Sequence, residues 1–523
     1  MLPYYINIML SQVSDMLFTR EILEIDKMNV TFTHMEGVDD ATDSWFGKTE
    51  QASLLDTLHE ASSRARQQQR SILASFTQPI TYYDPLHVFK AARQADVAAT
   101  FFWQHPAAQH ALVGMDTAAT IEVNGTNRFS DAASTWRTLL SDAVYTTTAE
   151  ALYGSGPLFF GGFAFDPLRP RTALWADFPD GLLTLPRLLF SYYQGQAALT
   201  INTMVTAQSN REQIVRDITT MMQPLHQQLE QFSAAPDEES DENNQLAVQN
   251  VLPAQEWMQI VAATVHAIQQ GTYEKVVLAR SVEVTTSERA FNIEATLSRL
   301  RQSYPGAYVF AIQRGERFFV GATPERLVQA QNGQIQTMAL AGSAPRGTTL
   351  TEDEYIGNEL LHSAKNQHEH AIVVARIREA LAEHCSEVVV APEPQLLKLK
   401  NVQHLETPIV GTLLEGRCIL GVMANLHPTP AVAGFPREAA LEAIRATERL
   451  DRGWYAGPLG WIGAGGHGEF AVALRSGLVE DNKATLFAGC GIVADSNPQS
   501  EYNESCLKLQ AMLRGLGQQE EEV

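Results

Sequence analysis

Three observations on the sequence predict an α+β fold. Short strand-like runs separated by turn residues dominate residues 98–205, whereas helical periodicity recurs in several segments after residue 250. Strands and helices do not alternate regularly, so the βαβ units of a doubly wound parallel sheet are not indicated. The chain has 523 residues and an apolar content of 45%, which allows one large domain with a large core. We therefore expect layers of strands and helices.

The first half of the chain contains most of the predicted strands. Residues 1–75 are polar, Gln/Arg-rich around residues 64–70, and are treated as an N-terminal extension of undetermined order. The N-terminal half of the α+β unit is assigned to 76–232, with a helix over 209–231. Its strands are predicted at 98–103, 111–113, 120–123, 158–165, 188–194 and 197–205. Residues 233–246 are acidic and nearly free of apolar side chains, which predicts a solvated loop.

Residues 250–512 form the second predicted region, where the periodicity is clearer. Helices are predicted over 253–270, from about 352 to 383, from Glu438 and from Pro498. Strands are predicted over 275–281, 307–313, 317–321, 387–391, 469–475 and 484–493. The residues around His404 are predicted to form a loop. Asp495 or Ser496 is expected to cap the last helix, because Asn497-Pro498 is typical of a helix start.

Two carboxylates lie on one face of that last helix. Glu501, Glu504 and Lys508 have the spacing i, i+3, i+7, which places them on the same side. A Gly-Cys-Gly turn at 489–491 precedes them, and a ligand can approach the backbone closely at such a turn. This combination is typical of a divalent-cation site. An ordinary surface ion pair between Glu504 and Lys508 is the alternative that the spacing leaves open.

Charge and cysteine content restrict the class of protein. The formal net charge of −22 argues against a nucleic-acid or anionic-membrane partner. No apolar run reaches the ~18 to 20 residues that a membrane helix needs, and the N-terminus lacks the basic region of a signal peptide. The four cysteines are Cys385, Cys418, Cys490 and Cys506. They form no Cys-x-x-Cys pair, and this wide spacing is typical of reduced thiols. A cytoplasmic enzyme is therefore expected.

A series of ordered motifs resembles the chorismate-utilising enzymes, and within them the isochorismate synthases. The motifs are Glu-Lys275-Val-Val-Leu-Ala-Arg280, Gly-Ala-Thr-Pro-Glu325-Arg, Ala-Gly342-Ser-Ala-Pro-Arg-Gly, Lys-Asn-Gln-His-Glu369-His, Val-Gln-His404-Leu, Leu-His-Pro-Thr-Pro-Ala431, the strand with Arg475, Ala-Gly489-Cys-Gly491-Ile-Val and Glu501-x-x-Glu504-x-x-x-Lys508. The resemblance is dense over 250–512 and looser over 80–230. It implies one α+β unit of two packed, antiparallel-rich sheets flanked by helices, with the active site between them.

The resemblance also implies a reaction. Water adds to C2 of chorismate, the double bonds shift and the C4 hydroxyl leaves, which gives isochorismate reversibly. Lys275 matches the general base of the family, a role that requires its pKa to fall below the ordinary ~10.4. Glu325 matches the acid that protonates the departing hydroxyl, which requires a raised pKa. Without the resemblance, these residues read as a surface lysine and a helix-start glutamate.

The same resemblance implies ligands for Mg²⁺ and for the substrate. Glu369 and Glu504 match the metal ligands, with Glu501 beside them acting through water. His368 and His370 flank Glu369, but side chains at i and i+2 of a helix diverge, so zinc is not expected. Arg475 and Lys508 match the positions that hold the enolpyruvyl carboxylate, and a buried ion pair is the alternative for Arg475. The other residues implied to line the pocket are His404, Gly342, Ala431, Gly489 and Gly491.

Two positions indicate which member of the family the chain resembles. Ammonia-using anthranilate and aminodeoxychorismate synthases typically carry glutamine in place of Lys275. Salicylate synthases keep the lysine but carry threonine in place of Ala431. An isochorismate synthase with little lyase activity is therefore implied, and the length of the chain favours a role in menaquinone biosynthesis. Salicylate synthase and a siderophore-pathway isochorismate synthase are the alternatives.

The expected partner is the small molecule chorismate, and the expected state is a monomer, with a dimer as the alternative. A non-catalytic binding protein that kept the fold is the hypothesis from another class. Each matched position carries a chemically competent residue, which argues against it.

Overall fold

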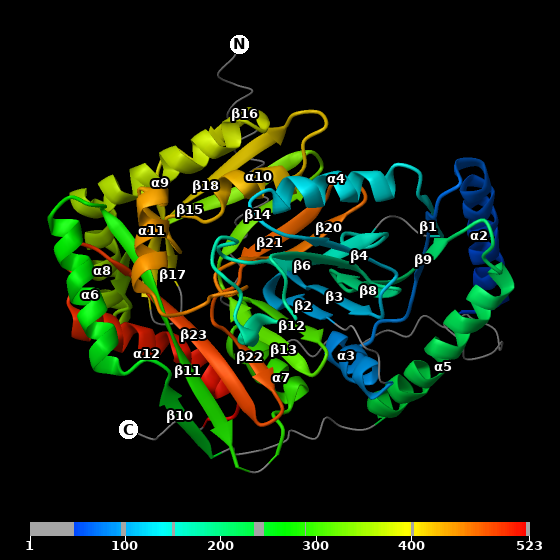
Figure 1. Ribbon diagram of the computed structural model, residues 1–523, viewed down its shortest axis with the longest axis horizontal. Coiled ribbons are helices and arrows are strands. Elements are labelled where there is room, and N and C mark those ends of the chain that lie inside the picture. Colours follow the sequence, from blue (N-terminus) through cyan, green and yellow to red (C-terminus); the bar gives the residue numbers. More distant parts are fainter. Residues whose placement is uncertain are drawn as a thin grey trace. The chain divides into compact units, whose positions relative to one another are not determined.

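The computed structural model describes residues 46–95, 101–148, 152–234, 245–287, 289–398 and 402–518. Within these ranges the strands form two large sheets, and helices cover them (Figure 1). Pairing is antiparallel apart from β1 (Ile72–Pro79) with β5 (Val144–Thr147), which is parallel. The predicted α+β fold with two antiparallel-rich sheets is confirmed.

The larger sheet contains strands from both predicted halves of the chain. In spatial order it consists of β10 (Leu246–Asn250), β11 (Lys275–Thr286), β23 (Lys483–Ile492), β22 (Ser476–Glu480), β13 (Arg317–Thr323), β12 (Tyr308–Arg314), β2 (Phe101–His105), β3 (His110–Met115), β8 (Leu188–Tyr193), β9 (Gln196–Val205), β1 and β5, with β19 (Gly434–Phe435) paired to β11. The β12–β2 pair joins the two halves in register.

The smaller sheet also mixes the two halves. Its order is β16 (Cys385–Val390), β18 (Val402–Leu413), β15 (Gln334–Pro345), β14 (Arg326–Gln331), β21 (Gly468–Val472), β20 (Pro458–Gly463), β6 (Leu158–Phe163), β7 (Gly181–Leu185) and β4 (Ala119–Val123), with β17 (Gln395–Lys398) paired to β18. Here the β20–β6 pair joins residues from the two halves.

Helices cover the outer faces of both sheets. On the larger sheet lie α2 (Lys48–Gln68), α3 (Pro85–Gln94), α5 (Arg211–Ala234), α7 (Ile293–Ser303) and α12 (Pro498–Gly515), with α6 (Ala254–Gln269) against α12 and α11 (Arg437–Thr447) against β11. On the smaller sheet lie α4 (Arg128–Leu140), α8 (Leu350–His362), α9 (Ala364–Ala382) and α10 (Ile419–Leu426). Two 3₁₀ turns are η1 (Pro106–Ala108) and η2 (Ala173–Trp175). No described helix is both long and apolar enough to cross a lipid bilayer.

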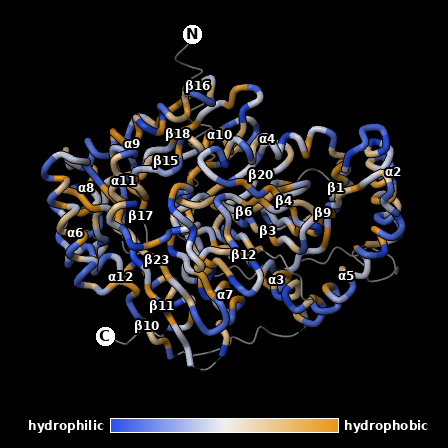
Figure 2. The backbone as a smooth tube through the Cα atoms, in the orientation of Figure 1, coloured by the Kyte–Doolittle hydropathy of each residue, from blue (hydrophilic) through white to orange (hydrophobic). Residues whose placement is uncertain are grey.

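The larger sheet is buried on both faces, which explains its continuous apolar runs. Side chains alternate across a strand, so Phe101 and Trp103 of β2 belong to the core between the sheets. Phe102 points the other way and belongs to the core under the outer helices. Figure 2 shows hydrophobic residues along the strands and hydrophilic residues along the outer helix α2. Because both faces are packed, the larger sheet is a rigid support for the residues of the site.

The predicted N-terminal extension reaches too far into the chain. Residues 46–75 contain α2 and the first part of β1, and β1 pairs with both β9 and β5. The apolar part of the buried stripe of α2 is narrow, at Leu54, Leu58, Ala61 and Ala65. The polar Thr57 and Ser62 are buried beside it and hide the period. Residues 1–45 lie outside the described residues. So does most of the predicted acidic loop, because α5 extends to residue 234 and the next described residue is 245.

Three predictions near the site are wrong in detail. The single helix over 352–383 is two helices, because Ser363 is extended and its hydroxyl caps α9 by accepting from the Asn366 N–H. The residues around His404 form β18, whose buried positions include the polar Gln403, so the alternation is not visible in hydropathy. The cap of α12 is Asn497, whose side chain accepts from two backbone N–H groups.

Candidate active site

Glu325 and Arg475 lie where the chain crosses from one sheet to the other. Glu325 is in the link from β13 of the larger sheet to β14 of the smaller one. Arg475 is in the reverse link, from β21 to β22. The two links lie side by side, because Val472 N–H donates to the Glu325 carbonyl at 2.9 Å and Ala322 N–H donates to the Arg475 carbonyl at 3.1 Å. Residues 150 positions apart are therefore neighbours.

Arg475 is not in a strand, contrary to the prediction for 469–475, because β21 ends at Val472. Its φ of 48° lies in the left-handed region, which is uncommon for residues other than glycine. The Arg475 Nη1 donates to the carbonyl of Lys508 on α12 at 3.3 Å. Burial lowers the pKa of Arg475, although Tyr455 and other groups oppose this. A half-buried arginine in an unusual backbone conformation makes Arg475 a candidate binding residue.

Lys275 connects the two sheets. It opens β11 in the larger sheet, and its Nζ lies 3.3 Å from Oε1 of Glu369 on α9, which packs on the smaller sheet. The two side chains are 23% and 35% exposed. Gly491 on β23 makes room for the lysine, because a Cβ there would lie 2.9 Å from Lys275 Cε. The position is therefore a half-buried ion pair at the junction of the sheets.

Lys508 binds two groups beside this junction. Its Nζ lies 2.6 Å from Glu504 Oε1 and donates to the Gly489 carbonyl at 2.9 Å. Gly489 is a position of close approach, since a Cβ there would lie 3.3 Å from the hydroxyl oxygen of Tyr455. The predicted i,i+4 pair on α12 is thus present, and the same lysine also reaches β23.

His404 lies on β18 and faces the same group of charges. Its Nδ1 lies 2.8 Å from the Ser343 hydroxyl on β15. Gly342 lies at a β-bulge with φ of 74°, and its backbone hydrogen-bonds the ring. Burial lowers the pKa of His404, and Lys508 lowers it further, so the ring is neutral at pH 7. It can therefore accept or donate a hydrogen bond without adding charge.

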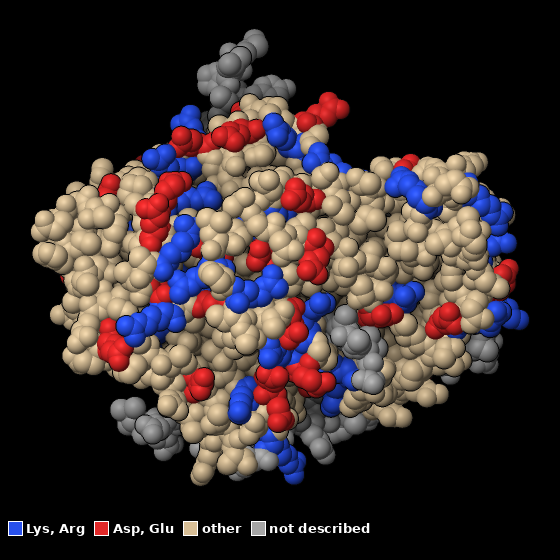
Figure 3. Space-filling model, in the orientation of Figure 1, with Lys and Arg blue, Asp and Glu red and all other residues tan. Residues whose placement is uncertain are grey.

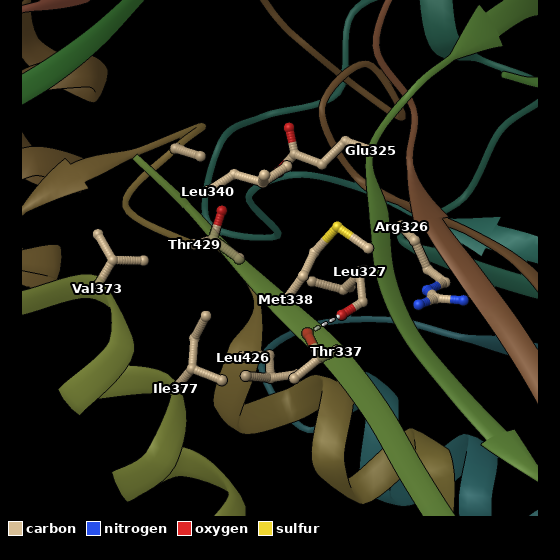
Figure 4. A pocket seen from close by; sticks show the side chains of 11 residues that line it. Glu325, Arg326, Leu327, Thr337, Met338, Leu340, Val373, Ile377, Leu426 and Thr429 are labelled. Atoms are coloured by element: carbon tan, nitrogen blue, oxygen red, sulfur yellow. Dashed lines mark hydrogen bonds between the residues drawn. The ribbon is translucent and has the colours of Figure 1, made fainter. Parts of the chain in front are cut away.

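Glu325 has a different environment, since its carboxyl group points into a cavity with mainly apolar walls (Figure 4). The walls come from β14, β15, α9, α10 and the segment after α10, and the lining side chains include Leu327, Met338, Leu340, Val373, Ile377, Leu426, Thr429 and Ala431. Burial raises the pKa of Glu325 to about 7, although Lys275, Lys508 and Arg475 oppose this. Glu325 is thus the residue shared by the cavity and by the group of cations.

The acidic side chains of α12 form a candidate cation site. Ligand atoms of Cys490, Glu501 and Glu504 lie within 4.8 Å of one another. Burial raises the pKa of the Cys490 thiol to about 12, so the thiol is protonated and only the two carboxylates fit a hard cation such as Mg²⁺. Glu501 also accepts from the Ser496 hydroxyl at 2.7 Å. Among the described residues Glu369 is not part of this group, and its carboxylate lies 3.3 Å from the Lys275 Nζ.

The predicted residues therefore gather at one place. Hydrogen bonds, ion pairs or shared electrostatic effects connect Lys275, Glu325, Glu369, His404, Arg475, Glu501, Glu504, Lys508, Gly342, Gly489 and Gly491, and Ala431 shares the cavity of Glu325. His368 is exposed, whereas His370 is buried and contacts Thr407 at 2.7 Å, so the two histidines do diverge.

Two residues were missed by the sequence analysis. Tyr455 lies against Gly489, and its hydroxyl faces the surroundings of Arg475. Thr429 lines the cavity of Glu325, and its buried hydroxyl has no hydrogen-bond partner among the described residues. Both belong to motifs that the sequence displays, but only the fold shows which side chain of each motif faces the site.

On the face seen in Figure 3, basic side chains do not form a separate surface. Figure 3 shows Lys and Arg interspersed with Asp and Glu over the face in view. Lys275, Lys508 and Arg475 provide local positive charge beside Glu325, within a chain of net charge −22.

Comparison with known proteins identifies the family. Residues 58–517 match the chorismate binding enzymes. The chain belongs to this family. The match begins within α2, so the family region includes part of the predicted extension. Isochorismate synthase MenF of Bacillus subtilis is 37% identical over 477 residues, covering 90% of this chain and 98% of that protein.

Two further members of the family are similar over most of the chain. The salicylate biosynthesis isochorismate synthase of Pseudomonas aeruginosa is 37% identical over 473 residues, which is 89% of this chain and 94% of that protein. The solved structure of MenF, the menaquinone-specific isochorismate synthase of Escherichia coli, has a TM-score of 0.67 at 26% identity. The similarity covers 88% of this chain and 100% of the Escherichia coli chain. The two-sheet architecture of this chain is thus that of a chorismate binding enzyme.

Proposed function

We propose that the chain is an isochorismate synthase, an isomerase that converts chorismate reversibly to isochorismate. The observation that carries this proposal is Glu325, a carboxyl group with a pKa of about 7 that lies between an apolar cavity and three cations. Such a group can give and take a proton near neutral pH. The similarity to isochorismate synthases over nearly the whole chain supports the same reaction.

In the proposed reaction Lys275 and Glu325 act as base and acid. Lys275 takes a proton from water while the water oxygen bonds to C2 of the ring. The two ring double bonds shift, from C1=C2 and C5=C6 to C1=C6 and C4=C5, and the C4–oxygen bond breaks. Glu325 gives its proton to the departing oxygen, so that water leaves and both groups have exchanged one proton. In the reverse direction the two residues exchange roles, which a pKa near 7 allows for Glu325.

The substrate is held by its two carboxylates. Arg475 and Lys508 would bind the enolpyruvyl carboxylate, with His404 and the backbone at Gly342, Gly489 and Gly491 completing the wall. Ala431 lines the cavity on the side of Glu325.

Glu504 and Glu501 would hold Mg²⁺, because their oxygen atoms lie close together and carboxylates suit this ion. The bound ion would neutralise the ring carboxylate of the substrate. Glu369 is the third proposed ligand on the basis of the family resemblance, although it pairs with Lys275 here.

The product is proposed to serve menaquinone biosynthesis. Support comes from the MenF of Bacillus subtilis, of which the chain covers 98%, and from the similarity to the menaquinone-specific structure. Supply of isochorismate for salicylate is the second candidate, because the Pseudomonas aeruginosa protein is equally identical. We also propose a cytoplasmic monomer with chorismate as its small-molecule partner. The four free thiols and the net charge of −22 support the cytoplasm and argue against nucleic-acid or membrane partners.

Product analysis tests the proposal. The purified full-length protein is incubated with chorismate and Mg²⁺, with and without ammonium, and the products are separated by chromatography. We expect isochorismate at a fixed equilibrium ratio, the same with ammonium, and loss of the reaction on chelation. Salicylate with pyruvate would show that Ala431 does not exclude lyase chemistry. Anthranilate or aminodeoxychorismate formed only with ammonium would contradict the role of Lys275. Binding of chorismate without any turnover would favour a non-catalytic protein.

A further inference from the structure

Two buried side chains near the site have no part in the proposed chemistry. Glu448 follows α11, and Arg452 lies four residues later in the Asp451-Arg-Gly-Trp-Tyr motif. They form an ion pair at 2.7 Å, and their side chains are only 2% and 3% exposed. A buried ion pair is weak support for stability, because desolvation offsets most of the attraction. Its hydrogen bonds to the rest of the chain therefore indicate its role better than its own attraction does.

Arg452 connects two segments of the site. Its Nη2 donates to the carbonyl of Val277 at 2.8 Å, and its Nη1 donates to the carbonyl of Val432 at 2.9 Å. Val277 lies in β11, two residues after Lys275, and Val432 directly follows Ala431. One guanidinium group thus holds the strand that carries the proposed base to the segment that lines the cavity of the proposed acid.

Glu448 provides a hydrogen-bond acceptor along the edge of β11 that faces β19. β19 pairs with the first two residues of β11, and Val277 N–H then donates to the Ala433 carbonyl at 2.8 Å. The next inward N–H on that edge belongs to Ala279, and it donates to Glu448 Oε2 at 3.0 Å. Side chains of the ion pair therefore satisfy backbone groups of β11 where no neighbouring strand does.

The surroundings of Arg452 keep it in place. Its guanidinium lies over the ring of Phe165, 4.2 Å from the centroid. Asp451 accepts from the Gly453 N–H at 3.0 Å, and Gly453 has a φ of 49°. The Trp175 ring occupies the space of a Cβ at Gly453, within 2.1 Å, so only glycine fits there. A rigid motif thus presents the guanidinium to both carbonyls.

We propose that the Glu448–Arg452 pair is a positioning unit for the isomerisation, which fixes the Lys275 strand relative to the Ala431 segment. The proposal rests on the proposed function, since base and acid are assigned there. Base and acid act on two carbons of one small ring, so a shift of either segment misplaces one of them. Displacement of about 1 Å can lower a rate by about 10²-fold. Only a planar fork reaches two carbonyls and a carboxylate together, so lysine cannot replace Arg452.

Two variants separate positioning from stability. Arg452→Lys keeps the charge and loses the fork. Glu448→Gln combined with Arg452→Met removes both charges but keeps an acceptor for Ala279, so it loses the two bonds to the carbonyls without leaving a buried unpaired charge. The matched control is Asp84→Asn, which removes the partner of Arg301 on α7, an ion pair of 2.7 Å outside the two segments. Near-ultraviolet circular dichroism gives the folded fraction of each protein.

For both variants we expect kcat per folded enzyme to fall by roughly 10 to 100-fold, with KM for chorismate within about threefold of wild type. Hydrogen–deuterium exchange should become faster in peptides covering 275–281 and 429–435. The control should stay within about twofold in kcat and unchanged in both peptides. A purely structural role would lower the folded fraction and leave kcat per folded enzyme unchanged.

Three outcomes would overturn the proposal. They are wild-type kcat in the folded double variant, faster exchange without loss of kcat, and loss of kcat without faster exchange. Failure of the proposed function is distinguishable, because the wild-type protein would then form no isochorismate from chorismate. The exchange experiment needs no turnover and would still report whether the ion pair holds the two segments together.

Discussion

Glu325 and Glu504 lie in the same site but in opposite environments. Glu504 is 51% exposed on α12, and Lys508 neutralises it at 2.6 Å. Glu325 lies between the sheets against apolar side chains, and burial raises its pKa to about 7. Identical side chains therefore suit the two different tasks proposed for them, one to carry charge and the other to carry a proton. The environment of each carboxyl group, rather than the residue type, therefore determines which of these two tasks it suits.

The largest expected effect is at Lys275, the residue proposed as the base that works with the proton-carrying Glu325. Lys275 acts electrostatically on Glu325 and pairs directly with Glu369. We expect Lys275→Ala to lower isochorismate formation by at least about 10³-fold, since the general base is lost. Far-ultraviolet circular dichroism should not change. Lys483→Ala, an exposed lysine on β23, is the control and should keep wild-type turnover. Substantial activity in Lys275→Ala would show that water is activated by another group.

Amide substitutions compare the two glutamates directly. Glu325→Gln cannot give a proton, so turnover should fall by about 10² to 10³-fold at every Mg²⁺ concentration. Glu504→Gln should instead raise the Mg²⁺ concentration needed for half-maximal activity by at least about tenfold, and excess Mg²⁺ should restore much of the rate. Initial rates measured across a Mg²⁺ titration separate the two. If excess Mg²⁺ restored the turnover of Glu325→Gln, Glu325 and Glu504 would not have the different roles proposed for them.

The raised pKa of Glu325 also predicts a dependence of stability on pH. A carboxyl group with a folded-state pKa of about 7 and an ordinary value of 4.5 favours folding when protonated, so its contribution is lost as pH rises from about 4.5 to 7. In the Glu325→Gln variant this position cannot ionise. The free energy of unfolding of the variant relative to wild type should therefore rise by about 3 kcal/mol between pH 4 and pH 8. Urea unfolding at both pH values measures this, and an equal difference at both would contradict the raised pKa.

The sequence proposed residues that the structure brings close together, but most of their contacts came only from the fold. Lys275 and Glu504 were identified through short motifs, which keep their residue spacing whatever surrounds them. The contact between the Glu325 and Arg475 links depends on pairing between strands far apart in the chain, which no local pattern specifies. β18 was missed because polar Gln403 and Thr407 occupy its buried positions, where hydropathy gives no alternation. The pairing of Glu369 with Lys275 joins two sheets and needed the whole fold.

Tyr455 gives the smallest predicted effect and sharpens the comparison between binding and proton transfer. Its hydroxyl lies against Gly489 and near Arg475, on the side of the site assigned to the enolpyruvyl carboxylate. The ring is stacked on Phe487 at 5.2 Å, so Tyr455→Phe should keep the packing and lose one hydroxyl.

We expect this variant to raise KM for chorismate by roughly two to tenfold, the effect of one neutral hydrogen bond, with kcat within about twofold. Steady-state kinetics beside Tyr145→Phe, which changes an exposed tyrosine on β5, provide the measurement and its control. A fall in kcat at unchanged KM would place the hydroxyl among the groups that move protons. The part of the site beside Gly489 of β23, proposed here to bind the enolpyruvyl carboxylate, would then also contain a group that moves protons.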